Sequence, residues 1–273
     1  MVTALVLFGL TVVASALAGL KPSSRSIRCM NNYRQLMAAW TMYTSEHSDQ
    51  VPNNFWIPDT QNEINNKTYR TWVNVIPDWT TSSMNTNTAL LRVGQLAPYL
   101  NGQTSPFKCP ADDYISLPQQ RAGWPSRVRS VSMNGFFGRS NASSSTDPTA
   151  VGLSSFATGY AQYLKLSRVP KPSKSWVLLD EHPDSINDGF FIVQAQATVW
   201  GDIPGSNHNG GCGFAFADGH SEMKQWLSTS SKIPVHFNYF PPTFDAAGRM
   251  DLQWLLARTG YLNGSTGIPA YGY

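Results

Sequence analysis

Charged side chains are scarce in this chain of 273 residues, and no cluster of basic residues is present. Asp, Glu, Lys and Arg make up 14% of the sequence, against about 25% in a typical soluble domain. The formal net charge is +3. Proteins that bind nucleic acid carry concentrated positive charge, so we expect no nucleic-acid partner. The composition is typical of β-rich extracellular proteins and of subunits that bury surface against neighbours.

Motifs for nucleophilic and phosphate chemistry are also missing. The sequence has no Gly-x-Ser-x-Gly turn that would present a reactive serine, and no glycine-rich phosphate loop before a predicted helix. We therefore predict that the chain is not an enzyme. Three Asn-x-Ser/Thr sequences matter only in a host that glycosylates, and they begin at Asn66, Asn141 and Asn263.

Cysteine is rare, with only three residues in the chain. An odd number leaves one thiol unpaired. Cys212 lies in a Gly-rich segment that is predicted to be a buried strand, which favours Cys29 and Cys109 as the disulfide pair. In the chain-entropy model, a loop of about 80 residues closed in this way would add ~4–5 kcal/mol of stability. The alternative is that all three are small buried hydrophobic side chains.

The longest segment without charge is residues 2–20. As an α-helix it would measure about 28 Å, close to the ~30 Å hydrocarbon core of a bilayer. Three interpretations are open: a cleavable secretory signal, a membrane anchor, and a helix that starts in the membrane and then packs against copies of itself. Small residues would allow close contact between such helices, namely Gly9, Ala14, Ala16, Ala18 and Gly19.

A second helical segment is predicted over residues 27–48, because apolar side chains recur there every three or four positions. Residues 49–273 form a predicted β-rich head domain, with strands near 69–76, 127–137, 175–180, 190–193, 213–217 and 220–226 and a short helix at 251–259. The predicted fold class is α+β. In it, a long N-terminal hydrophobic helix, made of residues 1–20 and 27–48, packs on an antiparallel β-sheet.

One predicted strand is flanked by side chains that suit a transition metal. His208 precedes the strand, and Asp218 and His220 follow it. Further ligands could come from residues 180–182, Asp-Glu-His, at the end of another apolar strand. The alternative is a polar cluster that hydrogen-bonds loops at a sheet edge.

Residues 184–189 partly match a calcium-binding loop, with acidic residues at the first and fifth positions and Gly at the sixth. Ile186 stands at the third position and Ala195 at the twelfth, where an EF-hand has Glu, so an EF-hand is excluded. An irregular Ca²⁺ loop built from Asp184, Asn187 and Asp188 is one interpretation, and a tight turn is the other.

Several segments resemble bacterial prepilin-type, pseudopilin-like proteins, whose C-terminal signature is His, nine residues, then Asp-Gly. His208, Asp218 and Gly219 have this spacing. Residues 28–36, 94–100, 107–112, 129–135 and 251–255 resemble other segments of the family and occur in family order. The resemblance therefore extends over nearly the whole chain.

The resemblance implies a type IV pilin-like fold and a structural role in a pilus or pseudopilus-like helical filament, such as that of type II secretion. It also favours the Cys29–Cys109 pair and assigns no catalytic residue. Expected partners are copies of the chain, a prepilin peptidase, the assembly machinery and the inner membrane before assembly. The expected location is the inner membrane, then a cell-surface filament. Helices would pack in the filament core through Val6, Phe8, Leu10, Val13 and Leu17.

The N-terminal segment departs from the family pattern, and two other functions stay open. The family's processing sequence, Gly followed by Phe-Thr-Leu-x-Glu, is absent, and Leu5 stands where pilins usually carry Glu. One alternative function is a membrane-anchored, metal-dependent hydrolase that uses His208, Asp218 and His220. The other is a surface adhesive or carbohydrate-binding protein, for which the nine Trp residues are the only argument.

Overall fold

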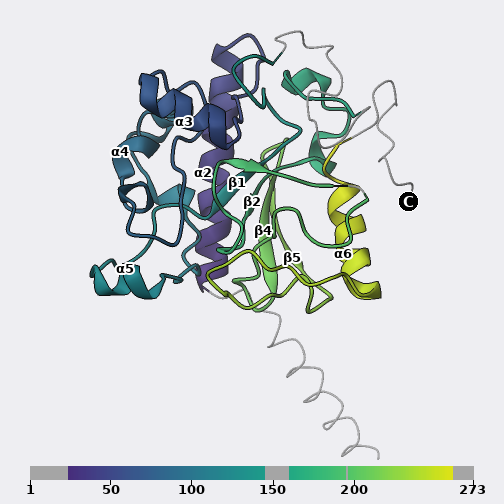
Figure 1. The fold of residues 1–273 in the computed structure, drawn as a ribbon. Helices are drawn as coiled ribbons and strands as arrows, with labels where there is room; N and C mark the ends of the chain where they lie inside the picture. The colour runs from purple at the N-terminus through teal and green to yellow at the C-terminus, as the bar shows by residue number, and fades with distance from the viewer. Residues whose placement is uncertain (1–23, 145–159, 195, 261–273) are drawn as a thin grey trace, which may run out of the picture.

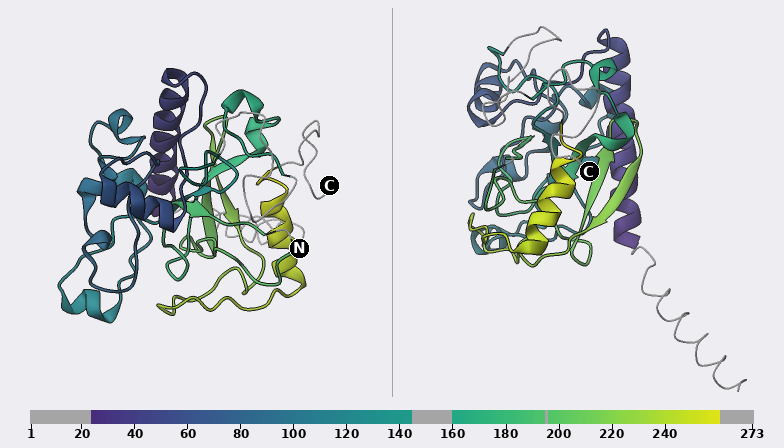
Figure 2. Two further views of the ribbon diagram at one scale, coloured as in Figure 1. Left: turned by 45° about the horizontal axis from the view of Figure 1, so that its top comes forward. Right: turned by 90° about the vertical axis from the view of Figure 1, so that its right-hand side faces the viewer.

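A five-stranded sheet with one helix on each face forms the centre of the molecule (Figures 1 and 2). This computed structural model describes residues 24–144, 160–194 and 196–260. The strand order is β3-β1-β2-β4-β5. The strands are β1 (Val131–Asn134), β2 (Trp176–Asp180), β3 (Phe190–Phe191), β4 (Gly211–Phe216) and β5 (Ser221–Gln225).

Helix α2 (Ser24–Glu46) covers one face of the sheet. Its buried side chains recur at intervals of three or four residues, which gives the helix a single apolar face, and they include Cys29, Tyr33, Leu36, Met37, Trp40 and Tyr43. These side chains belong to one hydrophobic cluster with Val177, Leu178 and Ala215 of the sheet. The helix predicted over residues 27–48 is confirmed, with slightly different ends.

Helix α6 (Ala246–Leu256) covers the opposite face (Figure 2). Asp245 caps its start, because the side-chain oxygen accepts the Gly248 N–H at 2.6 Å. A second hydrophobic cluster joins α6 to the sheet, and it contains Trp176, Leu179, Phe214, Phe216, Trp226, Leu252 and Leu255. Both faces of the sheet are therefore buried.

Short helices and irregular backbone fill the part of the chain between α2 and β1. They are α3 (Ile57–Asn66), η1 (Ser83–Asn85), α4 (Thr88–Leu91), η2 (Ala97–Leu100), η3 (Ser105–Phe107) and α5 (Leu117–Arg121). Two more 3₁₀ turns, η4 (Leu166–Arg168) and η5 (Pro172–Lys174), precede β2. The strand predicted at 69–76 is wrong: these residues are not part of the five-stranded sheet, and the Trp72 N–H donates to the Asn53 carbonyl in a loop.

The predicted fold class is wrong in two respects. The sheet is mixed rather than antiparallel, because β1 and β3 run parallel, with Met133 opposite Phe190. In addition, no helix within the described ranges is long and apolar enough to cross a membrane.

The second finding also corrects the predicted location, since the inner-membrane precursor depended on such a helix. Residues 1–20, to which the predicted hydrophobic helix was assigned, lie outside the described residues. The predicted assembly contacts at Val6, Phe8, Leu10, Val13 and Leu17 lie there too.

Candidate metal centre

Four side chains from four separate segments converge between α2 and the sheet. They are Cys29 in α2, Cys109 just after η3, Asp180 at the end of β2 and His208 before β4. One ligand atom from each residue lies within 4.8 Å of all the others. We call these residues the four-ligand cluster. In the part of the chain that the structure describes, no other group of three or more His, Cys, Asp or Glu residues is this close.

Three contacts within the cluster are close to the lengths expected between neighbouring ligands of one ion. Cys29 Sγ lies 3.2 Å from Asp180 Oδ2, and Cys109 Sγ lies 3.2 Å from His208 Nε2. His208 Nε2 is 3.8 Å from Asp180 Oδ2. Tetrahedral zinc, with bonds of about 2.0–2.3 Å, separates its ligand atoms by roughly 3.3–3.8 Å. Two sulfurs, one imidazole nitrogen and one carboxylate oxygen are a ligand set that zinc accepts.

Cys109 is held in a tight turn that orients its sulfur. The Asp112 N–H donates to the Cys109 carbonyl at 3.1 Å, and the Ala111 N–H donates to Cys109 Sγ at 3.3 Å. Lys108 Nζ donates to the Asp112 carbonyl, on the other side of the turn. An N–H group aimed at sulfur stabilises the thiolate, which is the form that binds a metal.

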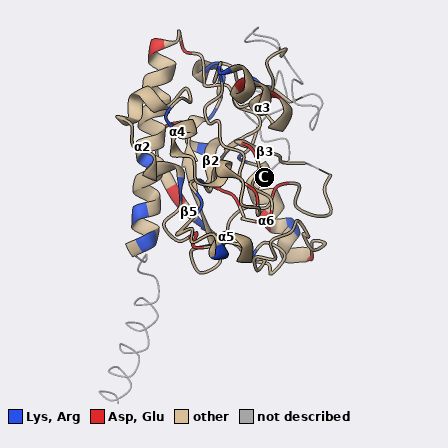
Figure 3. Cartoon of the chain, turned by 60° about the vertical axis from the view of Figure 1, so that its left-hand side comes forward, with Lys and Arg blue, Asp and Glu red and all other residues tan. Residues whose placement is uncertain are grey.

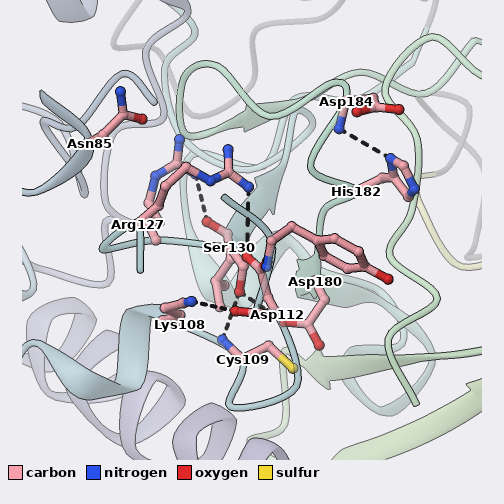
Figure 4. A network of polar contacts seen from close by, with 12 residues as sticks. Asn85, Lys108, Cys109, Asp112, Arg127, Ser130, Asp180, His182 and Asp184 are labelled. Carbon is pink, nitrogen blue, oxygen red and sulfur yellow. Dashed lines mark hydrogen bonds and ion pairs between the residues drawn. The ribbon is translucent and has the colours of Figure 1, made fainter. Parts of the chain in front are cut away.

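Asp180 and Cys109 share one hydrogen-bonding residue, Ser130, and all three are labelled in Figure 4. The Ser130 hydroxyl accepts the Cys109 N–H at 2.7 Å and lies 3.5 Å from Asp180 Oδ1, to which it donates. Strand pairing sets this arrangement, because Val131 of β1 lies opposite Asp180 of β2. The second oxygen, Oδ2, is the one that faces the other ligands.

His208 is oriented by a residue of α2. Its Nδ1 lies 3.2 Å from Ser26 Oγ, and both side chains are buried. A proton on Nδ1, donated to Ser26, leaves the lone pair of Nε2 directed toward Cys109 and Asp180. Ring nitrogens of metal-binding histidines have partners of this kind, which fix the ring and its tautomer.

Two glycines make room for the cluster. A Cβ atom on Gly213 would lie 2.5 Å from Cε2 of Tyr33 and 3.3 Å from Cys29 Sγ. A Cβ atom on Gly205 would lie 2.9 Å from the Asp180 carbonyl oxygen. Strand β4 can therefore approach α2 closely only because position 213 has no side chain.

Without a cation, the environment of the cluster favours the uncharged form of every ligand. Burial raises the pKa of Asp180 to about 6, and burial lowers the pKa of His208. Contact with Cys109, then burial and the nearby Asp180, raises the pKa of Cys29. The pKa of Cys109 is also raised: contact with Cys29 lowers it, but burial and Asp180 outweigh that contact. A divalent cation would reverse this balance by stabilising the deprotonated ligands.

The metal-ligand set predicted from the sequence is only partly brought together. His208 belongs to the four-ligand cluster, but Asp218 and His220 lie beyond the far end of β4. Their side chains contact each other at 2.5 Å and are more than a third exposed. The six residues of β4 span roughly 20 Å, so Asp218 and His220 cannot share an ion with His208.

The side chains of the predicted calcium loop accept hydrogen bonds from backbone N–H groups. The carboxylate of Asp184 accepts the N–H groups of His236 and Phe237, at 2.7 and 2.8 Å. Asp188 Oδ1 accepts the Phe190 N–H at 2.8 Å, and Asn187 Oδ1 accepts the Asp188 N–H at 2.5 Å. The contacts of Asn187 and Asp188 are local and fit a tight turn, whereas Asp184 binds backbone N–H groups more than 50 residues away. A Ca²⁺ ion in this loop stays a prediction.

The three cysteines are free thiols in the structure. Cys29 and Cys109 lie together, as expected for a pair, but as members of the four-ligand cluster. Cys212 belongs to the hydrophobic cluster on the α6 side of the sheet, and its Sγ lies 3.3 Å from the Asp180 carbonyl oxygen. The sequence pattern indicated His208, with Asp180 as an additional ligand, but it did not indicate the two cysteines as metal ligands.

Comparison with protein-family models, with curated proteins and with solved structures found no match to this chain. The resemblance to pseudopilin-like proteins therefore stays a prediction.

Proposed function

We propose that this chain is a zinc-binding structural protein. In this proposal Cys29, Cys109, Asp180 and His208 hold one Zn²⁺ ion that ties α2 to the sheet. The observation that carries the proposal is the convergence of four ligand atoms within 4.8 Å from segments far apart in the sequence. Burial of two thiols, a carboxylate and an imidazole together costs free energy when no metal is bound, because each polar group loses its hydration.

The closed ligand set favours a structural role over a catalytic one. Structural zinc sites have four protein ligands, whereas catalytic sites keep one position for water or substrate. All four residues of the cluster are at most 5% exposed, as expected for the ligands of a closed structural site. Five of the Trp residues are buried, which favours a role in the core over carbohydrate binding. They are Trp40, Trp72, Trp176, Trp200 and Trp226.

The test is the metal content of the full-length protein, purified without chelators and measured by mass spectrometry. We expect stoichiometric zinc in the wild type and a loss of most of it in Cys29→Ser and His208→Ala. Replacement of the zinc by Co²⁺ should give the visible absorption of a tetrahedral thiolate site. Cys212→Ser is the matched control and should retain its zinc, because Cys212 is not in the four-ligand cluster. A wild-type protein that binds neither metal would overturn the proposal.

As a second candidate function, we propose that copies of the chain assemble into a pilus-like helical filament. The uncharged sequence of residues 2–20 leads into α2, and that helix exposes Ile27 and Met42 by 52% and 50%. Apolar surface of this kind contributes about 25 cal/mol per Å² when it is buried between copies.

Electron microscopy and sedimentation of the full-length chain test this second candidate. We expect helical assemblies that are lost when Phe8 and Val13 are both changed to Lys. Val93→Lys, at an exposed apolar position elsewhere in the head, should leave assembly unchanged. A wild type that stays monodisperse at all concentrations would contradict the candidate.

A further inference from the structure

We infer that the four-ligand cluster is also a site of thiol oxidation, at which a hydroperoxide converts Cys29 and Cys109 into a disulfide and the zinc leaves. The inference rests on the proposed zinc site. It adds a second, metal-free state in which a covalent bond replaces the ion between α2 and the segment after η3.

A hollow in the surface borders one of the two cysteines. The hollow has a volume of about 490 Å³, and Cys109 is the one member of the cluster among its lining residues. Arg25, Arg28 and Lys108 also line it, and the blue segments of α2 in Figure 3 mark positions of Lys or Arg along the first half of the helix. Of the two cysteines only Cys109 borders the hollow, so the inference assigns the first reaction to it.

Cys29 is placed to react second. Its sulfur lies within 4.8 Å of that of Cys109, so a bond of about 2.05 Å requires the two atoms to approach by less than about 3 Å. Cys212 is not an alternative partner, since its side chain packs in the hydrophobic cluster on the α6 side of the sheet, whereas Cys29 and Cys109 belong to the α2 side.

The chemistry balances with hydrogen peroxide as the two-electron oxidant. The Cys109 thiolate attacks one peroxide oxygen, the O–O bond breaks, and the hydroxide that leaves takes a proton from solvent to form water. The Cys29 thiolate then attacks the resulting sulfenic acid sulfur. An S–S bond forms, and the second hydroxide leaves and takes up another proton. Zinc stays divalent throughout and dissociates because two of its four ligands are gone.

The experiment treats the zinc-loaded, full-length protein with hydrogen peroxide and follows two signals. A chromophoric chelator reports released zinc, and mass spectrometry of the intact and digested protein reports the cross-link. We expect zinc release in step with a loss of about two mass units and a peptide pair joined through Cys29 and Cys109. Added dithiothreitol should restore zinc binding. Cys212→Ser is the matched control and should behave like the wild type in both signals.

The outcomes separate this inference from the proposed function. A protein that holds no zinc before treatment defeats the proposed zinc site, and this inference with it. A protein that holds zinc but releases none under peroxide defeats the inference alone. Release accompanied by sulfinic acid, or by a cross-link to Cys212, also overturns it, because each shows that Cys29 is not the residue that reacts second.

Discussion

At the scale of single residues, proton binding by the ligands determines how zinc affinity depends on pH. The pKa values of Cys29 and Cys109 are raised in the structure without metal, so both side chains are thiols at neutral pH. Asp180 has a pKa of about 6 and is ionised above pH 6. Zinc must displace two thiol protons, and affinity falls as pH falls. We expect about a 100-fold change in the dissociation constant per pH unit between about pH 6.5 and 8.

Competition with a chromophoric chelator across this pH range measures the slope. Cys109→Ser should lower both the affinity and the slope, because one displaced proton is lost. An affinity that changes less than about tenfold per pH unit would show that two thiols do not bind the metal.

A second prediction at this scale concerns Gly213, whose lack of a side chain allows β4 to lie against Tyr33 and Cys29. In Gly213→Ala, the new methyl group would meet Tyr33 Cε2 at 2.5 Å, so helix and strand must separate. We expect weaker zinc binding and a loss of about 1–3 kcal/mol in the free energy of unfolding.

Zinc titration and urea unfolding check the effect of Gly213→Ala. Gly201→Ala is a matched control, because its nearest contact would be an ordinary 3.4 Å to Ile192. Equal zinc affinity in Gly213→Ala and in the control would contradict the steric argument.

At the scale of elements, the four-ligand cluster connects the first turns of α2 to the sheet. Ser26 and Cys29 contribute from α2, while Asp180 and His208 lie next to β2 and β4. Removal of zinc leaves polar groups buried between these elements, since Cys29, Asp180 and His208 stay at most 5% exposed. We expect the N-terminal half of α2 to open more often after chelation, whereas α6, on the other face, stays protected.

Amide hydrogen exchange of the full-length protein, with and without a chelator, tests this expectation. Exchange in the first half of α2 should accelerate by about 10-fold or more, which corresponds to at least ~1.4 kcal/mol. A matched measurement on Cys212→Ser should repeat the wild-type pattern. Uniform acceleration across α2 and α6 alike would mean that the ion stabilises the whole domain without a preference for α2.

Elements with a strong apolar pattern were predictable from the sequence. The spacing of Tyr33, Met37 and Trp40 predicts one buried face, and α2 buries all three. Ile27, which was expected on the same face, is 52% exposed. Strand β2 matches the apolar run that predicted it. A strand was also predicted at residues 190–193, where β3 lies. Its parallel pairing with β1 arises from the return of the chain after β2, which no local pattern records.

The candidate site was predictable only in part, for the same reason. His208 stands out by its position before an apolar strand. The nearest of its partners in the sequence, Asp180, is 28 residues away. Asp218 and His220 are closer in sequence and yet lie at the other end of β4. Two cysteines at this separation suit a disulfide and a metal site equally well. Only the packing of α2 on the sheet distinguishes these alternatives.

At the scale of the whole molecule, a sheet buried on both faces also encloses acidic groups outside the metal centre. Asp188 is 5% exposed, and burial raises its pKa from 3.8 to about 7. Arg129, whose side chain donates to the Asp188 carbonyl at 2.6 Å, keeps its charge, since burial lowers its pKa only to about 10. The folded state therefore holds a proton on Asp188 at pH values where the unfolded chain has released it.

This difference makes the protein less stable as pH rises. A folded pKa above the unfolded value gives a stabilising contribution that is complete below pH 3.8 and is lost as the pH rises through about 7. Relative to Asp188→Asn, which keeps the Oδ1 acceptor for the Phe190 N–H, the wild type should lose about 2–3 kcal/mol in the free energy of unfolding between about pH 5 and 8.

Urea unfolding with zinc removed by a chelator measures this difference without the opposite pH dependence of metal binding. Parallel curves for the wild type and Asp188→Asn would show that Asp188 is already ionised in the folded protein at pH 5, and that the sheet buries its charge together with that of Arg129.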